Sequence, residues 1–103
     1  MEIVNAVSKV RFASSGSQHV HLARGDSLRV DLICMEPGQK DRVAEGPCAY
    51  YVVTGSAVLA PGGSADGQPL PAGHLAELAD GERCTLANAG EARLICLMIH
   101  PPK

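Results

Sequence analysis

The sequence predicts an all-β domain folded as a barrel or a sandwich. Short strand-like segments recur along the chain and are separated by clusters of Gly, Pro, Asn and Asp. No segment combines a helical apolar period with helix caps, so we expect little helix. Closing the sheet on itself would protect strand edges that otherwise pair with neighbouring molecules.

Length and composition predict one domain. A chain of 103 residues is long enough for a single core and too short for two. We therefore expect one domain over residues 1–103, with a barrel core over about 27–101 and an N-terminal strand or arm over 1–26. With 46% hydrophobic residues, two tyrosines and one phenylalanine, the core should be mainly aliphatic.

Charge and hydropathy exclude several classes of partner. The formal net charge is -2, and the nine Lys and Arg residues are scattered, so we expect no nucleic acid partner. The N-terminus lacks the apolar run of a signal peptide, and the apolar stretch 94–99 is too short to span a bilayer. We expect no membrane partner and a cytoplasmic location, where the four cysteines would be free thiols.

The strand-like segments follow in order along the chain. Residues 27–36 alternate and predict a half-buried strand, with Arg29 and Asp31 on its solvent face and Leu28, Val30, Leu32 and Cys34 on its core face. Pro37-Gly38 breaks the chain, and a polar loop over 39–47 leads to a β-branched and aromatic strand that ends at Thr54-Gly55.

The second half of the chain is divided by turn residues. Residues 56–60 predict a return strand, 61–69 an exposed loop and 71–73 a turn. Short strands are expected over 74–78 and 84–87, followed by a turn at 88–90 and a last strand within 92–102. Asn88 should fix its turn through side-chain hydrogen bonds to the backbone.

Two groups of spaced glycines resemble the two motifs of a small single-domain cupin, of the RmlC-like kind. The second motif is matched by Gly73, Gly81 and Asn88, with Ala79 where that family has proline and Cys84 where it has histidine. The first motif is matched by Pro37-Gly38 and by the run AYYVVTG that ends at Gly55. Counting back from Gly55 places Cys48 at the glutamate position.

The resemblance covers about residues 28–101 and is specific for fold. It implies a cupin barrel, a double-stranded β-helix or jelly roll, which is usually a homodimer and has a ligand pocket, often with a metal, at its open end. The loop between Gly38 and Gly55 is shorter than the first motif needs and contains no histidine. All four metal-binding residue types of the family are therefore replaced, so the metal site should be degenerate.

The resemblance also implies that Cys48 and Cys84 point into one pocket. One interpretation is a zinc or iron site in which both thiolates act with a carboxylate, Glu45 or Asp41. Another is a redox-active or nucleophilic thiol pair, which needs a lowered thiol pKa. We favour a third, in which both cysteines are small apolar wall residues of a pocket without metal. Glu45 and Asp41 are then solvated charges.

Other residues are candidates for the same pocket. Strand alternation from Cys48 puts Tyr50 inward and Tyr51 outward, so Tyr50 either offers its hydroxyl to a ligand or fills volume. The predicted pocket is Cys48, Tyr50, Cys84 and Leu86. His19 and His21 share a strand face and could bind a metal together, but a partly exposed pair is the favoured interpretation. His100 is expected to be a strand-end residue.

These patterns favour a cupin-fold homodimer without catalytic activity, which binds a small molecule or has a structural role and needs no cofactor. The alternative is an enzyme, an oxygenase or isomerase with a divalent transition metal at Cys48, Cys84 and Glu45. No catalytic residue is assigned.

Overall fold

The protein is described by a computed structural model, over residues 1–62 and 66–102. Its regular structure in these ranges consists of strands, as the sequence predicts, apart from one 3-10 turn, η1 (Ala6–Lys9). The strands of the described chain are β1 (Gln18–Arg24), β2 (Arg29–Met35), β3 (Ala44–Glu45), β4 (Cys48–Thr54), β5 (Ser56–Pro61), β6 (Gln68–Pro71), β7 (Leu75–Leu78), β8 (Arg83–Ala87) and β9 (Leu94–His100). No helix in these ranges is long and apolar enough to cross a membrane.

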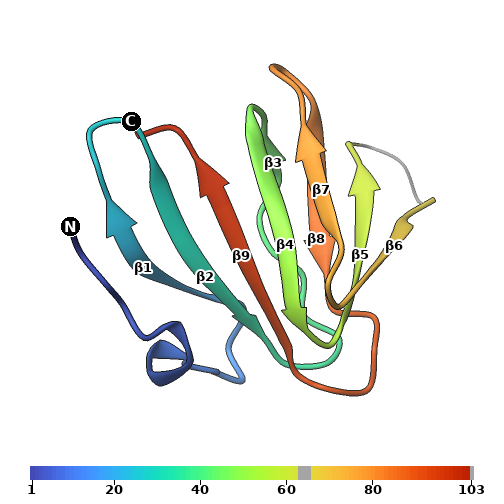
Figure 1. The fold of residues 1–103 in the computed structure, drawn as a ribbon. Coiled ribbons are helices and arrows are strands. Elements are labelled where there is room, and N and C mark those ends of the chain that lie inside the picture. The colour runs from blue at the N-terminus through green and yellow to red at the C-terminus, as the bar shows by residue number, and fades with distance from the viewer. Residues whose placement is uncertain (63–65, 103) are drawn as a thin grey trace.

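The strands form two antiparallel sheets that face each other. The larger sheet has the order β1-β2-β9-β4-β7, and the smaller sheet has the order β3-β8-β5-β6. Figure 1 shows the larger sheet in front, with β3 behind β4, and the N-terminal segment with η1 beside β1. The connection from β4 to β5 at Gly55 passes from one sheet to the other. Residues 1–26 thus contain a strand of the larger sheet.

The core lies between the two sheets and is mainly aliphatic. Both sheets contribute to it, and its members are Ile33, Met35, Cys48, Tyr50, Val52, Ala57, Leu70, Leu78, Cys84, Leu86, Leu94 and Cys96. Tyr50 is fully buried and Tyr51 is 37% exposed, which confirms the predicted alternation on β4. Burial of these side chains is the main favourable contribution to folding.

The predicted faces of β2 are wrong. Ile33 and Met35 belong to the core cluster, whereas Leu32 and Cys34 are buried on the other side of the strand. Asp31 shares the face of Ile33 and is only 5% exposed, so it points into the barrel instead of into solvent. Alternation misleads because β2 is buried on both faces, and the polar residues belong to the interior.

The expected loop over 61–69 is shorter than predicted. Pro61 ends β5, and Gln68–Pro71 form β6, which pairs with β5 at the end of the smaller sheet. An edge strand tolerates Pro69 and Pro71 because a proline removes a backbone donor that a central strand would need. The part of the predicted loop at residues 63–65 lies outside the described residues.

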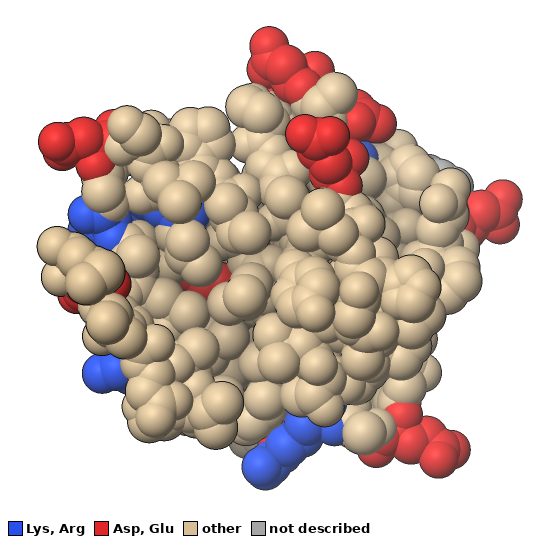
Figure 2. All heavy atoms as spheres, viewed as in Figure 1, with Lys and Arg blue, Asp and Glu red and all other residues tan. Residues whose placement is uncertain are grey.

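Most charged side chains avoid the front of the larger sheet. Figure 2 shows most of the Lys, Arg, Asp and Glu along the rim of this face, with an acidic patch and some basic atoms inside its left half and uncharged atoms over the rest. Tyr51 and Leu75 are neighbours in this exposed layer, 37% and 61% exposed, and they oppose each other in the β4–β7 register. The outer face of the larger sheet is therefore largely apolar where β4 pairs with β7.

Candidate functional site

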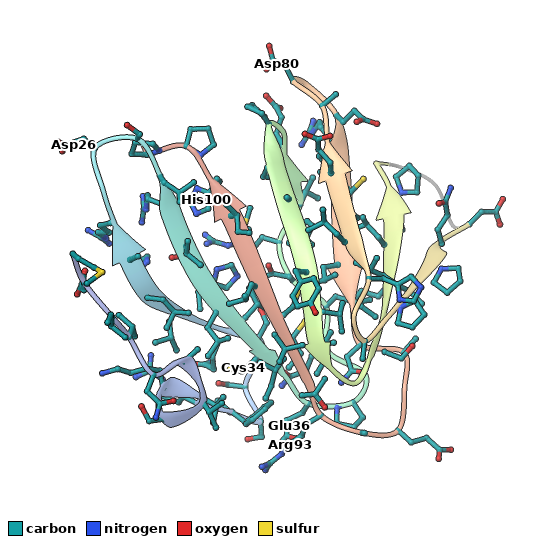
Figure 3. The ribbon with its side chains drawn as sticks, in the orientation of Figure 1. Asp26, Cys34, Glu36, Asp80, Arg93 and His100 are labelled. Atoms are coloured by element: carbon teal, nitrogen blue, oxygen red, sulfur yellow. The ribbon has the colours of Figure 1, made fainter. Side chains whose placement is uncertain are left out.

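The interior of the larger sheet changes from apolar to basic along its strands. Residues paired across antiparallel strands lie on the same face, so the register places Val52, Cys96, Ile33 and His19 in one transverse row. The next row contains Tyr50, Met98, Asp31 and His21. Beyond it lie His100, Arg29 and Arg24, the basic row. Figure 3 shows His100 near the end of β9, beside the β1–β2 connection.

Asp31 holds two histidines at the centre of this end of the barrel. Its Oδ1 is 2.6 Å from His21 Nδ1, and its Oδ2 is 3.0 Å from His100 Nε2. Burial by itself would raise the pKa of Asp31, but the hydrogen bonds from His21 and His100 lower it below the ordinary value. Asp31 is therefore ionised at neutral pH, and both facing imidazole nitrogens must carry a proton and donate to it.

A second carboxylate, Asp41, joins the edges of the two sheets. His19 Nε2 lies 2.9 and 2.8 Å from the two Asp41 oxygens, and the Ser17 hydroxyl donates to Oδ1 at 2.8 Å. Asp41 N also donates to Leu86 O on β8, at 2.8 Å. These contacts connect β1 to the segment that precedes β3, so they close the barrel on one side. We call the pair of His19 and Asp41 the seam.

The seam fixes the protonation state of both partners. The hydrogen bond to Asp41 raises the pKa of His19, against the opposing effect of burial. Burial would raise the pKa of Asp41, but the hydrogen bond and the charge of His19 lower it overall. The side chain of Asp41 is only 5% exposed, so the expectation that it is a solvated charge is wrong.

The seam should make stability depend on pH. Because the pKa of His19 is raised above 6.5 and that of Asp41 lowered below 3.8, the pair stabilises most between these values. The contribution of His19 is lost as the pH rises through its raised pKa. We expect His19→Gln to cost about 1–2 kcal/mol near pH 5.5 and clearly less near pH 8. Urea unfolding of both proteins at several pH values measures this, and a cost independent of pH would contradict it.

The predicted pocket residues lie together, but they fill the space between the sheets. Cys48, Tyr50, Cys84 and Leu86 all belong to the buried core cluster. Burial, and then the neighbouring Cys84, raises the pKa of the Cys48 thiol, and burial also raises that of Cys84. Both thiols are therefore protonated at neutral pH, which removes the thiolate that a nucleophile requires.

The third proposed metal ligand faces the other way. Ala44 pairs with Cys84 on β3 and β8, so the adjacent Glu45 points to the opposite face, where it pairs with Arg83 and is exposed. The described ranges contain no group of three His, Cys, Asp or Glu side chains arranged to hold a metal ion. Cys48, Cys84 and Glu45 therefore do not fit a metal ion in this arrangement.

Two polar groups inside the barrel lack a protein partner. The Tyr50 hydroxyl and Arg29 Nε are buried, and neither has a hydrogen-bond partner within residues 1–62 and 66–102. Burial raises the pKa of Tyr50 strongly, so its hydroxyl stays protonated. A buried donor without an acceptor is costly, so such groups are uncommon outside sites that receive a ligand or water.

Sequence reasoning finds Tyr50 and both cysteines but misses the acid–histidine contacts. The sequence pattern assigns Asp31 to solvent and Asp41 to a loop, although each pairs with a histidine at least ten residues away in sequence. The sequence does contain a signal for these contacts, namely Arg29 and Asp31. Charged residues at alternate positions of an apolar strand can lie on a polar interior face as well as on a solvent face. His19 and His21 do lie on a strand and are partly exposed, as expected.

Beside the seam, the surface has a cleft. Its volume is about 420 Å³, and its lining consists of Gly16, Ser17, His19, Lys40, Asp41 and Arg42. The cleft is open to solvent and lies away from Cys48 and Cys84, which do not line it. Both residues of the seam, His19 and Asp41, line this cleft.

The architecture is similar to that of several bacterial proteins. TT1209 from Thermus thermophilus superimposes with a TM-score of 0.87 at 20% identity, and 100% of each chain is covered. A conserved protein with a double-stranded β-helix domain from Klebsiella pneumoniae gives 0.89 at 20% identity, over 99% of this chain and 90% of that one. An RmlC-like cupin from Desulfovibrio desulfuricans gives 0.82 at 19% identity, over 100% and 99%.

Neither a protein-family model nor a curated protein matches the sequence. The structural similarity confirms the fold expected from the glycine spacings: the chain is a small protein with the cupin fold. At these identities the similarity extends to the fold alone.

Proposed function

We propose that the protein binds a small molecule at the His100 end of the barrel and does not catalyse a reaction there. The observation that carries this proposal is the Tyr50 hydroxyl, which is buried inside the barrel without a partner in the described chain. An unpaired buried hydroxyl costs about 1–3 kcal/mol, a cost that a bound polar ligand would remove. The protonated thiols of Cys48 and Cys84 offer no nucleophile beside it.

The position of Tyr50 suits a ligand that enters from the basic row. Tyr50 lies in the same transverse row as Met98 and Asp31, one row deeper than His100 and Arg29. A ligand between these rows would meet an apolar wall with a few polar groups, the usual composition of a small-molecule site. Asp31 keeps His21 and His100 in fixed orientations through hydrogen bonds, so the wall is organised before a ligand arrives.

Removal of the Tyr50 hydroxyl tests this proposal. Tyr50→Phe should stabilise the ligand-free protein by about 1 kcal/mol, because it deletes a buried polar group without a partner and keeps the ring. The same change at the partly exposed Tyr51 should have almost no effect. Urea unfolding measures both, and a clear loss of stability for Tyr50→Phe would show that its hydroxyl already has a partner.

Binding itself is measured by NMR screening of small polar fragments against the wild type and Tyr50→Phe. We expect fragments whose effects map to β2, β4 and β9 and which bind Tyr50→Phe more weakly. If no fragment binds the wild type, or if every one that binds does so outside the barrel, the proposed function is wrong.

We also propose that the protein is a homodimer through the outer face of its larger sheet. The register places Leu75, Tyr51, Leu97 and Val20 in one row on this face, together with Leu32, which the single chain already buries to 1% exposure. The charges lie mostly at its rim in Figure 2. A flat apolar sheet face with a charged rim is suited to pairing with its own copy by two-fold symmetry. The resemblance to cupins, which are usually homodimers, supports the same assembly.

A further inference from the structure

We infer that the ligand of the barrel is a small organic carboxylate, held by the guanidinium of Arg29 beside Arg24 and His100. The inference rests on the proposed function and gives its ligand a chemical class. It depends on the register of three strands, on the hydrogen bonds of Asp31 and on the unmatched donors of Arg29.

Basic side chains gather at this end of the larger sheet. Arg29 on β2 opposes Arg24 on β1 and His100 on β9, so three basic side chains occupy neighbouring positions on one sheet face. Like charges directly opposite each other in a sheet are destabilising. The whole chain carries a formal net charge of -2, so this row is a local feature and not part of a generally basic surface. An anion between these side chains would offset their repulsion.

Asp31, the nearest carboxylate in the register, is already engaged. One of its oxygens accepts from His21 and the other from His100, at 2.6 and 3.0 Å. The buried carboxylate therefore orients the two imidazoles and is not directed at Arg29.

The donors of Arg29 lack acceptors. Its Nη2 lies 3.5 Å from His21 Nδ1, but that nitrogen must carry a proton because it donates to Asp31. Two donors face each other there, so this contact cannot be a hydrogen bond. Arg29 Nε is buried and also has no acceptor in the described part of the chain. One edge of the guanidinium, Nε and Nη2, therefore has no acceptor, and an acceptor that reached it would meet two unmatched N–H donors.

A carboxylate suits this edge better than other anions. Its two oxygens match the parallel N–H groups of a guanidinium in a bidentate pair, whose geometry and charge both favour binding. Met98 and Tyr50 follow on the same face at the level of Asp31, so the body of the ligand would meet an apolar surface and then a hydroxyl. The ligand class is thus a small carboxylate that carries a second polar group, such as a hydroxy acid.

Glycolate, its neutral amide glycolamide and inorganic phosphate are the three probes. Each is titrated into ¹⁵N-labelled protein near neutral pH at low salt, and amide shifts are followed by NMR. We expect glycolate to shift amides of β1, β2 and β9 and to bind at least about ten-fold more tightly than glycolamide. Equal binding of the two, or binding of phosphate alone, would overturn the carboxylate inference.

Variants of Arg29 assign the effect to its side chain. Arg29→Gln should weaken glycolate binding at least about ten-fold. Arg29→Lys keeps the positive charge but lacks the paired N–H groups of the guanidinium, so its affinity for glycolate should lie between those of Arg29→Gln and the wild type. Arg83→Gln is the matched control, because Arg83 is an exposed arginine beside Glu45 on the smaller sheet. If Arg29→Gln does not fold, Arg29→Lys carries the test, because it removes the paired N–H groups and keeps the charge. Unchanged affinity in the folded variant would contradict the inference.

The outcomes separate this inference from the proposed function. If neutral fragments bind inside the barrel while glycolate does not, the carboxylate class is wrong and the binding function stands. If neither fragments nor glycolate bind, both are wrong.

Discussion

Replacement of Gly55 by alanine should lower the free energy of unfolding by about 3–5 kcal/mol. Gly55 has a φ of +90°, a conformation that residues with a Cβ rarely adopt. A Cβ at this position would lie 2.6 Å from the carbonyl oxygen of Arg93 and 3.0 Å from the Cα of Leu94. Because both neighbours are backbone atoms at the start of β9, they cannot move without disturbing the larger sheet.

Gly73→Ala is the matched control for this prediction. Gly73 has a φ of +81°, close to that of Gly55, but a Cβ there would meet no atom within 4 Å. The left-handed conformation alone should then cost about 1–2 kcal/mol. Urea unfolding monitored by circular dichroism compares the two variants, and equal losses would show that the contact with β9 has no cost of its own.

The two glycines belong to the motifs from which the fold was predicted. Gly38, Gly55, Gly73 and Gly81, the four glycines of those motifs, all have positive φ. These positions thus specify the backbone turns of the barrel, and they do so whether or not a metal is bound. This explains why the fold could be predicted from spacing alone, although the metal-binding residue types are replaced.

Asn88 is the other motif residue whose role is structural. It is 1% exposed, and its Nδ2 donates to Met35 O and Ala92 O at 3.1 and 2.9 Å. Its Oδ1 accepts from Gly90 N at 3.1 Å, which confirms the predicted role in the turn. The bond to Met35 goes further, because it ties this turn to the end of β2 across the barrel.

The candidate site was less predictable because its contacts are distant in sequence. Asp31 and His100 are 69 residues apart, and only the pairing of β2 with β9 brings them together. The alternation on β2 placed its apolar residues on the core face and its charged residues on the solvent face. That rule holds for a sheet that has one face in solvent. It fails on β2 because the outer face is also apolar and the inner face becomes polar towards the end of the barrel.

That apolar outer face underlies the second large effect that we expect. Tyr51→Glu should convert the proposed homodimer into a monomer, since it places a charge at the centre of the row formed with Leu75 and Leu97. A buried charge without a partner costs several kcal/mol, so the dissociation constant should rise about 100-fold or more. The side chain is 37% exposed in the single chain, so the monomer itself should still fold.

Sedimentation velocity and light scattering measure the mass of each variant, and circular dichroism confirms folding. Val43→Glu is the matched control, because Val43 is 52% exposed but lies just before β3, on the smaller sheet. We expect the wild type and Val43→Glu to have the mass of two chains and Tyr51→Glu that of one. A monomeric wild type, or equal dissociation of both variants, would contradict a dimer through this face.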